Sequence, residues 1–246
     1  GGGGVAGLAW EIGLLAGLAE AGADVTDADL VVGTSAGSFV GTLITSGADL
    51  DRLLTRQLAP VEPDRGPTAH YDTNQMLARL AEVVTGARGA RDARARIGAY
   101  AMAAQTAPAA DRRQDVAGRL GVRQWPERRL LVVAVDAESG EWVAFDRDSG
   151  VDIADAVAAS CAVPGIYPPV AVNGRHYIDG GVRSMVNADL AAGHDRVLIA
   201  APMPGMGIPT EVRRLEAKGS KVFVIRADQA SQQAFGTNIL DPAIRP

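Results

Sequence analysis

A serine flanked by glycines is the first group in this chain whose setting indicates chemistry. Residues 33–37 read Gly-Thr-Ser-Ala-Gly, which places Ser35 at the centre of a G-x-S-x-G pattern. The pattern carries a nucleophile where a buried strand turns sharply into a helix, because that turn lifts the hydroxyl out of the sheet. The apolar run at 30–33 and the helical spacing at 38–45 predict this context. Ser35 is therefore a candidate nucleophile.

The opening residues 1–7 read Gly-Gly-Gly-Gly-Val-Ala-Gly, ahead of a helix predicted over 10–21. Backbone N–H groups in such a loop suit an anion, either a phosphate or the oxyanion of a tetrahedral intermediate. The block also fits the G-x-G-x-x-G dinucleotide pattern, which expects an acidic residue at the end of the next strand. That strand leads into Ser35 instead, so the sequence favours an oxyanion site.

A serine nucleophile needs a base, and the three histidines, His70, His176 and His194, are poorly placed for it. The alternation of a strand puts His176 and Asp179 on opposite faces, His194 follows a predicted helix end, and His70 lies in a helical region. Asp179 remains, at the end of a predicted strand and followed by two glycines. Partial burial and a hydrogen bond to the serine would make this carboxylate a usable base, although a plain Asp-Gly-Gly turn stays an alternative.

The elements that must position these residues follow from apolar periodicity and turn signals. Predicted strands cover 130–135, 141–145, 170–172, 175–178, 196–200 and 221–226, and further helices cover 152–160 and 210–217. Hairpin turns are predicted at 138–140 and at Asn173-Gly174. Strands that alternate with helices predict an α/β layered fold.

Residues 60–125 differ from this pattern, with prolines first and then a stretch rich in alanine and arginine. We interpret this stretch as a helical cap or insert within one domain that covers 1–246. Its arginines are expected to form a solvated helical face, with contact to anionic lipid as the less favoured alternative. They are Arg88, Arg91, Arg94, Arg96, Arg112 and Arg113.

Composition narrows the function classes. With 246 residues and 47% hydrophobic content the chain can bury one core, and a net charge of −5 argues against a nucleic-acid partner. The single cysteine, Cys161, cannot form a disulfide within the chain, which favours a cytoplasmic location. Because it lies beside apolar residues, it is interpreted as a packing residue. The longest uncharged runs contain glycines or prolines and do not predict a membrane span. Because a glycine loop normally follows a buried strand, we expect an apolar strand upstream of residue 1.

The glycine-rich opening, G-x-S-x-G and a late Asp-Gly-Gly, in this order, resemble the patatin-like phospholipases. The proline-containing segment 159–169 is also similar to a loop of that family. The resemblance implies a three-layer α/β/α fold with a central, mostly parallel sheet. It also implies a dyad of Ser35 and Asp179, with Gly2, Gly3 and Gly4 forming the oxyanion hole. One departure is Ala6, which stands where the family commonly has arginine or lysine.

The function implied by this resemblance is hydrolysis of a lipid or other acyl ester through an acyl-enzyme, without a metal or organic cofactor. Peripheral contact with a membrane is compatible with it, whereas the head group, acyl length and oligomeric state stay open. Three alternatives remain: a hydrolase with a Ser-His-Asp triad, a nucleotide-binding module that uses the glycine loop, and an inactive relative.

Overall fold

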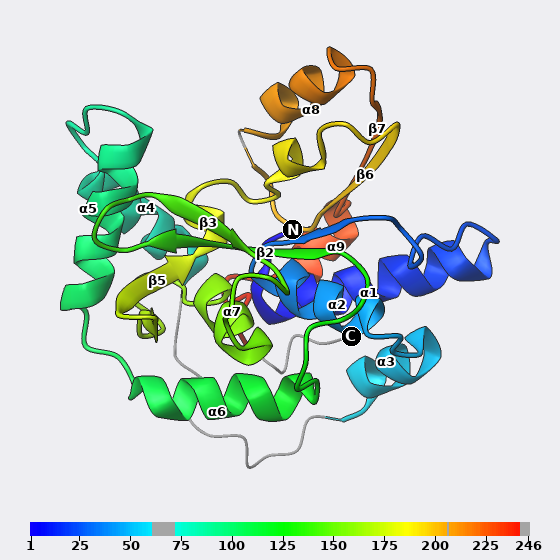
Figure 1. Cartoon of the computed structure of the whole chain (residues 1–246), viewed down its shortest axis with the longest axis horizontal. Helices are drawn as coiled ribbons and strands as arrows, with labels where there is room; N and C mark the ends of the chain where they lie inside the picture. Colours follow the sequence, from blue (N-terminus) through cyan, green and yellow to red (C-terminus); the bar gives the residue numbers. More distant parts are fainter. Residues whose placement is uncertain (61–71, 206, 242–246) are drawn as a thin grey trace.

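The computed structural model describes residues 1–60, 72–205 and 207–241, and its helices and strands pack in layers (Figure 1). The strands are β1 (Val31–Gly33), β2 (Leu130–Asp136), β3 (Trp142–Phe145), β4 (Val170–Val172), β5 (Arg175–Asp179), β6 (Arg196–Ala201) and β7 (Lys221–Arg226). The helices are α1 (Gly4–Glu20), α2 (Ala36–Thr45), α3 (Leu50–Leu58), α4 (Thr73–Val83), α5 (Ala90–Ala103), α6 (Ala109–Leu120), α7 (Ile153–Ser160), α8 (Ile208–Glu216) and α9 (Gln229–Phe235). Two short 3₁₀ helices, η1 (Gly180–Val182) and η2 (Ala188–Ala191), follow β5.

Helices cover both faces of the sheet that contains β2. On one face Val132 and Ala134 pack into the largest apolar cluster, which includes side chains of α2 and α7. On the other face Val135 packs with Ile97 of α5. Successive β2 residues point to opposite faces, and both faces are apolar because both are covered. The expected α/β class with helices on each side of a central sheet is confirmed.

The expectation that this sheet is mostly parallel is wrong. In the five-stranded sheet β1 pairs with β2 in parallel, whereas β2 with β3, β2 with β5 and β4 with β5 are antiparallel. The two predicted hairpin turns account for the β2–β3 and β4–β5 pairs, because strands joined by a tight turn must run in opposite directions. Asn173 and Gly174, with φ of 49° and 78°, make one of these turns. The other parallel pair, β6 with β7, forms a separate two-stranded sheet.

Strand β2 aligns the two segments that carry the candidate dyad. Val132 pairs with Gly33 of β1, and Ala134 pairs with Asp179 of β5, while β3 pairs with both of these β2 residues. Because a strand residue has one partner on each edge, β1 and β5 share the edge opposite β3. One runs parallel to β2 and the other antiparallel, so their carboxyl ends approach each other along that edge.

Helix α1 begins at Gly4, six residues before the apolar pattern that predicted a helix from Trp10. The pattern could not detect this start, because the first turn, Gly4 to Gly7, contains two glycines, which have weak helix propensity. The earlier start matters for the site, because it places the free N–H groups of the helix inside the glycine block.

The segment between 72 and 120 is helical, as predicted, and contains α4, α5 and α6. Residues 61–71, including His70, lie outside the described residues. The arginines are not a uniform solvated face: Arg91 and Arg94 donate from Nε to the carbonyls of Ser139 and Gly140, at 3.0 and 2.6 Å. They attach α5 to the turn between β2 and β3. The assignment of 1–246 to one domain stays a prediction.

Across the parts of the chain that the structure describes, helices long and apolar enough to cross a membrane are absent.

Candidate active site

Ser35 occupies a sharp turn between β1 and α2. Its φ and ψ are 52° and −118°, a conformation that residues with a side chain rarely adopt. The flanking glycines are required here: a Cβ on Gly33 would lie 2.5 Å from the Ser38 Cα, and one on Gly37 would lie 2.8 Å from the Gly1 nitrogen. The strand, turn and helix predicted around G-x-S-x-G are present, with the serine at the helix N-cap.

Two hydroxyl groups hold the Ser35 backbone. The Ser35 N–H donates to Ser160 Oγ at 3.0 Å, and Ser38 Oγ donates to the Ser35 carbonyl at 2.6 Å. Ser160 is the last residue of α7 and is fully buried. Sequence reasoning missed this contact, although a serine at the end of an alanine-rich apolar helix is a signal that the hydroxyl has a structural partner.

Asp179 ends β5 and is only 6% exposed. Burial raises the pKa of the Asp179 carboxyl to about 6, against smaller lowering effects of the Gly181 N–H, a hydrogen bond with the Ser35 side chain and the positive charge of Arg112. The Gly181 N–H donates to Asp179 Oδ1 at 2.7 Å. The structure therefore brings together a buried carboxylate and the candidate nucleophile, with the carboxylate ionised at neutral pH and more basic than usual.

The glycine block lies beside the serine turn. The Gly37 N–H donates to the Gly1 carbonyl at 2.9 Å, and a Cβ on Gly2 would lie 3.7 Å from the Ser35 Cβ. The Gly2 N–H donates to the Met185 carbonyl at 2.8 Å, so it is already used within the fold. The N–H groups of Gly3 and Gly4, at the start of α1, remain the better candidates to bind an oxyanion.

Ala6, at the position where the family pattern has a cation, is 2% exposed and packs with Ala227 and Phe235. Its environment is apolar, and positive charge at the serine cavity comes from a different element. Arg112 of α6 lines the cavity that contains Ser35 and acts electrostatically on both Asp179 and Cys161.

The cavity at Ser35 has a volume of about 50 Å³. Its lining is largely apolar and includes Val5, Leu8, Phe39, Val116, Val163 and Leu240. Arg112 and Arg119 of α6 add positive charge. The Arg112 guanidinium lies 3.8 Å from the centroid of the Tyr167 ring, and it pairs with Asp115 at 2.9 Å. Helix α6, from the predicted insert, therefore covers the candidate nucleophile.

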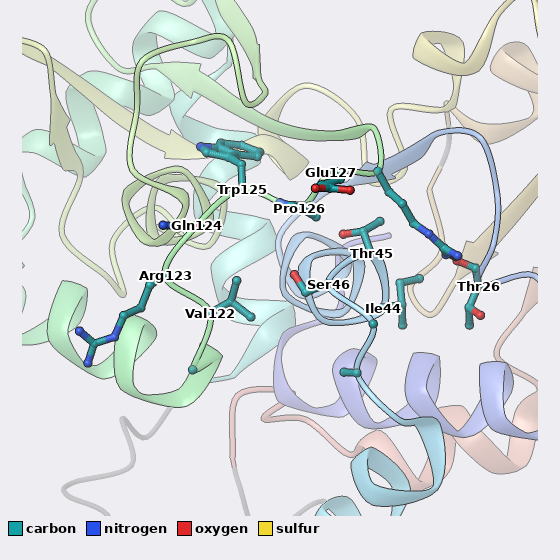
Figure 2. Close-up of a pocket in the computed structure, with 14 residues that line it drawn as sticks. Thr26, Ile44, Thr45, Ser46, Val122, Arg123, Gln124, Trp125, Pro126 and Glu127 are labelled. Carbon is teal, nitrogen blue, oxygen red and sulfur yellow. Dashed lines mark hydrogen bonds between the residues drawn. The ribbon is translucent and has the colours of Figure 1, made fainter.

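A much larger hollow, of about 820 Å³, lies elsewhere (Figure 2). It is formed by the carboxyl end of α2 with the turn after it, residues 44–48, by the loop 121–128 and by Thr26. Ser35 caps the opposite end of this ten-residue helix, roughly 15 Å away at 1.5 Å per residue. The hollow is therefore separate from the candidate nucleophile.

The two histidines within the described residues and the cysteine were also considered as catalytic groups, and the structure gives each of them other surroundings. His176 Nδ1 lies 3.6 Å from Glu138 Oε1, and His194 Nδ1 lies 3.1 Å from the Ala191 carbonyl. Burial, together with the nearby Asp179 charge, raises the pKa of Cys161 to about 11. Its thiol stays protonated at neutral pH, as expected for a packing residue.

A family model described as patatin-like phospholipase matches residues 1–192 of the chain. Among solved structures, the chain is similar to VipD from Legionella pneumophila, with 14% identity and a TM-score of 0.43 over 95% of this chain and 51% of that one. It is also similar to the type III effector protein ExoU, with 17% identity and a TM-score of 0.41 over 99% of this chain and 51% of that one. The chain spans about half the length of each of these proteins.

Proposed function

Because the chain belongs to the patatin-like phospholipase family, we propose that it hydrolyses carboxylic esters of lipids through a dyad of Ser35 and Asp179. The observation that carries this proposal is the meeting of β1 and β5 on one edge of β2. This arrangement supports the pairing of a buried carboxylate with a serine held in a strained turn.

In the proposed reaction Asp179 takes the proton of Ser35 as Oγ attacks the ester carbonyl. It then gives this proton to the leaving oxygen, so the alcohol departs and the carboxylate is ionised again. A water molecule hydrolyses the resulting acyl-enzyme, with the same carboxylate as the base. The raised pKa of Asp179, about 6, supports this role, because the group is a stronger base than an ordinary aspartate and is still ionised at neutral pH.

The oxyanion is assigned to the N–H groups of Gly3 and Gly4. Both lie at the start of α1, where the helix dipole is positive and backbone donors have no partner within the helix. The Gly2 N–H is not included, because it already donates to the Met185 carbonyl. Such fixed donors stabilise the charge that develops on the carbonyl oxygen in the transition state.

The cavity lining supports a lipid as substrate. Apolar side chains suit an acyl chain, and Arg112 with Arg119 suits an anionic group next to the ester. Ligand sites commonly have volumes of about 300 Å³ or more. The cavity of about 50 Å³ is smaller, so α6 or the segment with Leu240 must shift when an acyl chain enters.

Two measurements on the wild-type protein test the proposed function: turnover of p-nitrophenyl esters of increasing acyl length, and labelling by a fluorophosphonate. We expect turnover, and a single label on Ser35. A shift in thermal unfolding with NAD or ATP and no labelling would favour the nucleotide-binding alternative. A protein that neither turns over nor is labelled would be the inactive relative.

The pH dependence of kcat/KM is a further prediction. We expect kcat/KM to rise with pH through about 6 and then to level, because Asp179 accepts a proton only when ionised and its pKa is about 6. A pH profile of ester hydrolysis measures this value. An acid limb that disappears when His176 or His194 is replaced by glutamine would instead indicate a triad.

Replacing Arg112 with glutamine should move that acid limb to higher pH. Burial raises the pKa of Asp179 and the Arg112 charge lowers it, so the loss of this charge should raise the pKa further. The measurement is the pH profile of kcat/KM for Arg112→Gln against Arg113→Gln. Arg113 is the next residue in α6, but it pairs with Asp155. An identical shift in both variants would contradict a local effect of Arg112.

A further inference from the structure

Asn187 lies in the loop between η1 and η2, and its side chain is fully buried. Its φ and ψ are 48° and 36°, in the left-handed region that residues other than glycine seldom occupy. Glycine would adopt this backbone conformation more easily. The presence of an asparagine here indicates that its side-chain amide makes hydrogen bonds that the loop requires.

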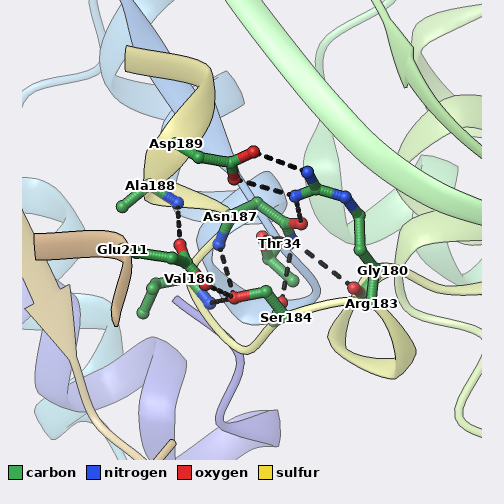
Figure 3. A network of polar contacts seen from close by, with 9 residues as sticks. All are labelled: Thr34, Gly180, Arg183, Ser184, Val186, Asn187, Ala188, Asp189 and Glu211. Carbon is green, nitrogen blue, oxygen red and sulfur yellow. Dashed lines mark hydrogen bonds and ion pairs between the residues drawn. The ribbon is translucent and has the colours of Figure 1, made fainter. Parts of the chain in front are cut away.

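The amide joins three segments (Figure 3). Asn187 Nδ2 donates to Thr34 Oγ1 at 2.9 Å and to the Ser184 carbonyl at 2.8 Å, and the Gly180 carbonyl lies at 3.4 Å. Asn187 Oδ1 accepts from the Arg183 guanidinium. A guanidinium only donates, so Oδ1 must face Arg183 and the NH₂ group must face the three oxygen acceptors.

Two of these partners adjoin the proposed dyad. Thr34 directly precedes Ser35, and Gly180 directly follows Asp179. We propose that Asn187 is a positioning residue, whose amide sets the separation of the serine turn and the aspartate loop. This inference rests on the proposed function.

Further contacts hold the amide itself. Arg183 pairs with both carboxylate oxygens of Asp189, at 2.9 and 2.6 Å, and lies 4.1 Å from the centroid of the Trp142 ring. Glu211 of α8 accepts from Ser184 Oγ and, at 2.6 Å, from the Ala188 N–H. The loop is therefore supported by β3 on one side and by α8 on the other. Glu211 lies beyond the residues that the family model matches.

The test compares Asn187→Gly with the wild type in p-nitrophenyl ester hydrolysis. Glycine adopts the left-handed backbone readily, and the change removes the side chain with its amide. A displacement of about 1 Å at a reacting group can reduce the rate on the order of 100-fold. We expect kcat to fall about 10- to 100-fold with KM within about 2-fold of the wild type, and fluorophosphonate labelling to slow in parallel.

Asn173→Gly is the matched control. Asn173 has nearly the same φ, 49°, in the exposed turn between β4 and β5, and it is far from the dyad in the sheet register. We expect wild-type kcat from this variant. Equal kcat in Asn187→Gly and Asn173→Gly, with both folded by circular dichroism, would overturn the inference.

Thr34→Val supplies a second route if Asn187→Gly does not fold, since valine has nearly the shape of threonine but no hydroxyl. We expect a smaller loss of kcat in Thr34→Val, and a double variant no slower than Asn187→Gly, because the two changes remove one interaction. Additive losses, or a Thr34→Val enzyme with full kcat, would contradict the link. An inactive wild type would contradict the proposed function instead, so the two failures are distinguishable.

Discussion

Replacing Ser35 with alanine is expected to abolish ester turnover and fluorophosphonate labelling. A nucleophile acts with its base as one unit, so its removal lowers kcat on the order of 10⁴-fold or more. The residual rate enhancement comes from stabilisation of the oxyanion and from substrate binding. The fold should survive, because the Ser35 backbone, not its hydroxyl, makes the contacts with Ser160 and Ser38. The measurements are kcat on a p-nitrophenyl ester and the extent of labelling.

Ser46→Ala is the control for this variant. Ser46 is exposed and caps the carboxyl end of α2, whereas Ser35 caps its amino end. It should keep wild-type turnover and one label. Turnover that persists in Ser35→Ala would refute the assignment of the nucleophile, whatever the behaviour of Ser46→Ala.

Replacing Asp179 with asparagine is expected to lower kcat about 10²- to 10⁴-fold, the usual contribution of a general base. The asparagine oxygen can still accept from the Gly181 N–H, but it cannot take the serine proton. Ester turnover at pH 8, where the wild-type carboxylate is ionised, measures this loss. Full turnover by Asp179→Asn would exclude the dyad.

The same variant should be more stable than the wild type at neutral pH. The folded pKa of Asp179, about 6, exceeds the ordinary value of 3.8, so the folded state binds the proton more tightly. The free energy of unfolding therefore falls as pH rises from about 3.8 to about 6, and it stays reduced at higher pH. About two pKa units correspond to a gain of about 3 kcal/mol in Asp179→Asn, seen as a raised Tm at pH 8.

Asp136→Asn is the opposite control. Burial acts to raise the pKa of Asp136, but hydrogen bonds from Ser139 and Arg175 outweigh it and lower the pKa. This carboxylate stabilises the folded state above its ordinary pKa, so its loss should lower Tm at pH 8 while turnover is retained. Equal Tm changes in the two variants would contradict the origin given for the Asp179 effect.

Much of this arrangement was predictable from local sequence, because its causes are local. The turn at Ser35 depends on glycines within two residues of it, and the turn at Asn173-Gly174 depends on two residues that adopt positive φ. The order of strands and helices follows from apolar periodicity over short windows. Ser35 and Asp179 could therefore be identified as candidates from motifs before any contact was known.

Only the tertiary structure decided how strands pair and which distant groups reach the site. Ser160 contacts Ser35 across 125 residues of chain, and Asn187 contacts Thr34 across 153. Arg112 comes from an insert whose composition predicted a solvated face, and the Gly2 N–H is used by Met185. Such contacts depend on where separate elements pack, and a single side chain leaves no periodic signal in the sequence. The sequence by itself therefore determined the candidate reacting groups and the local turns that carry them. Packing decided the pKa of Asp179, the separation of the two segments and which helix lies over Ser35.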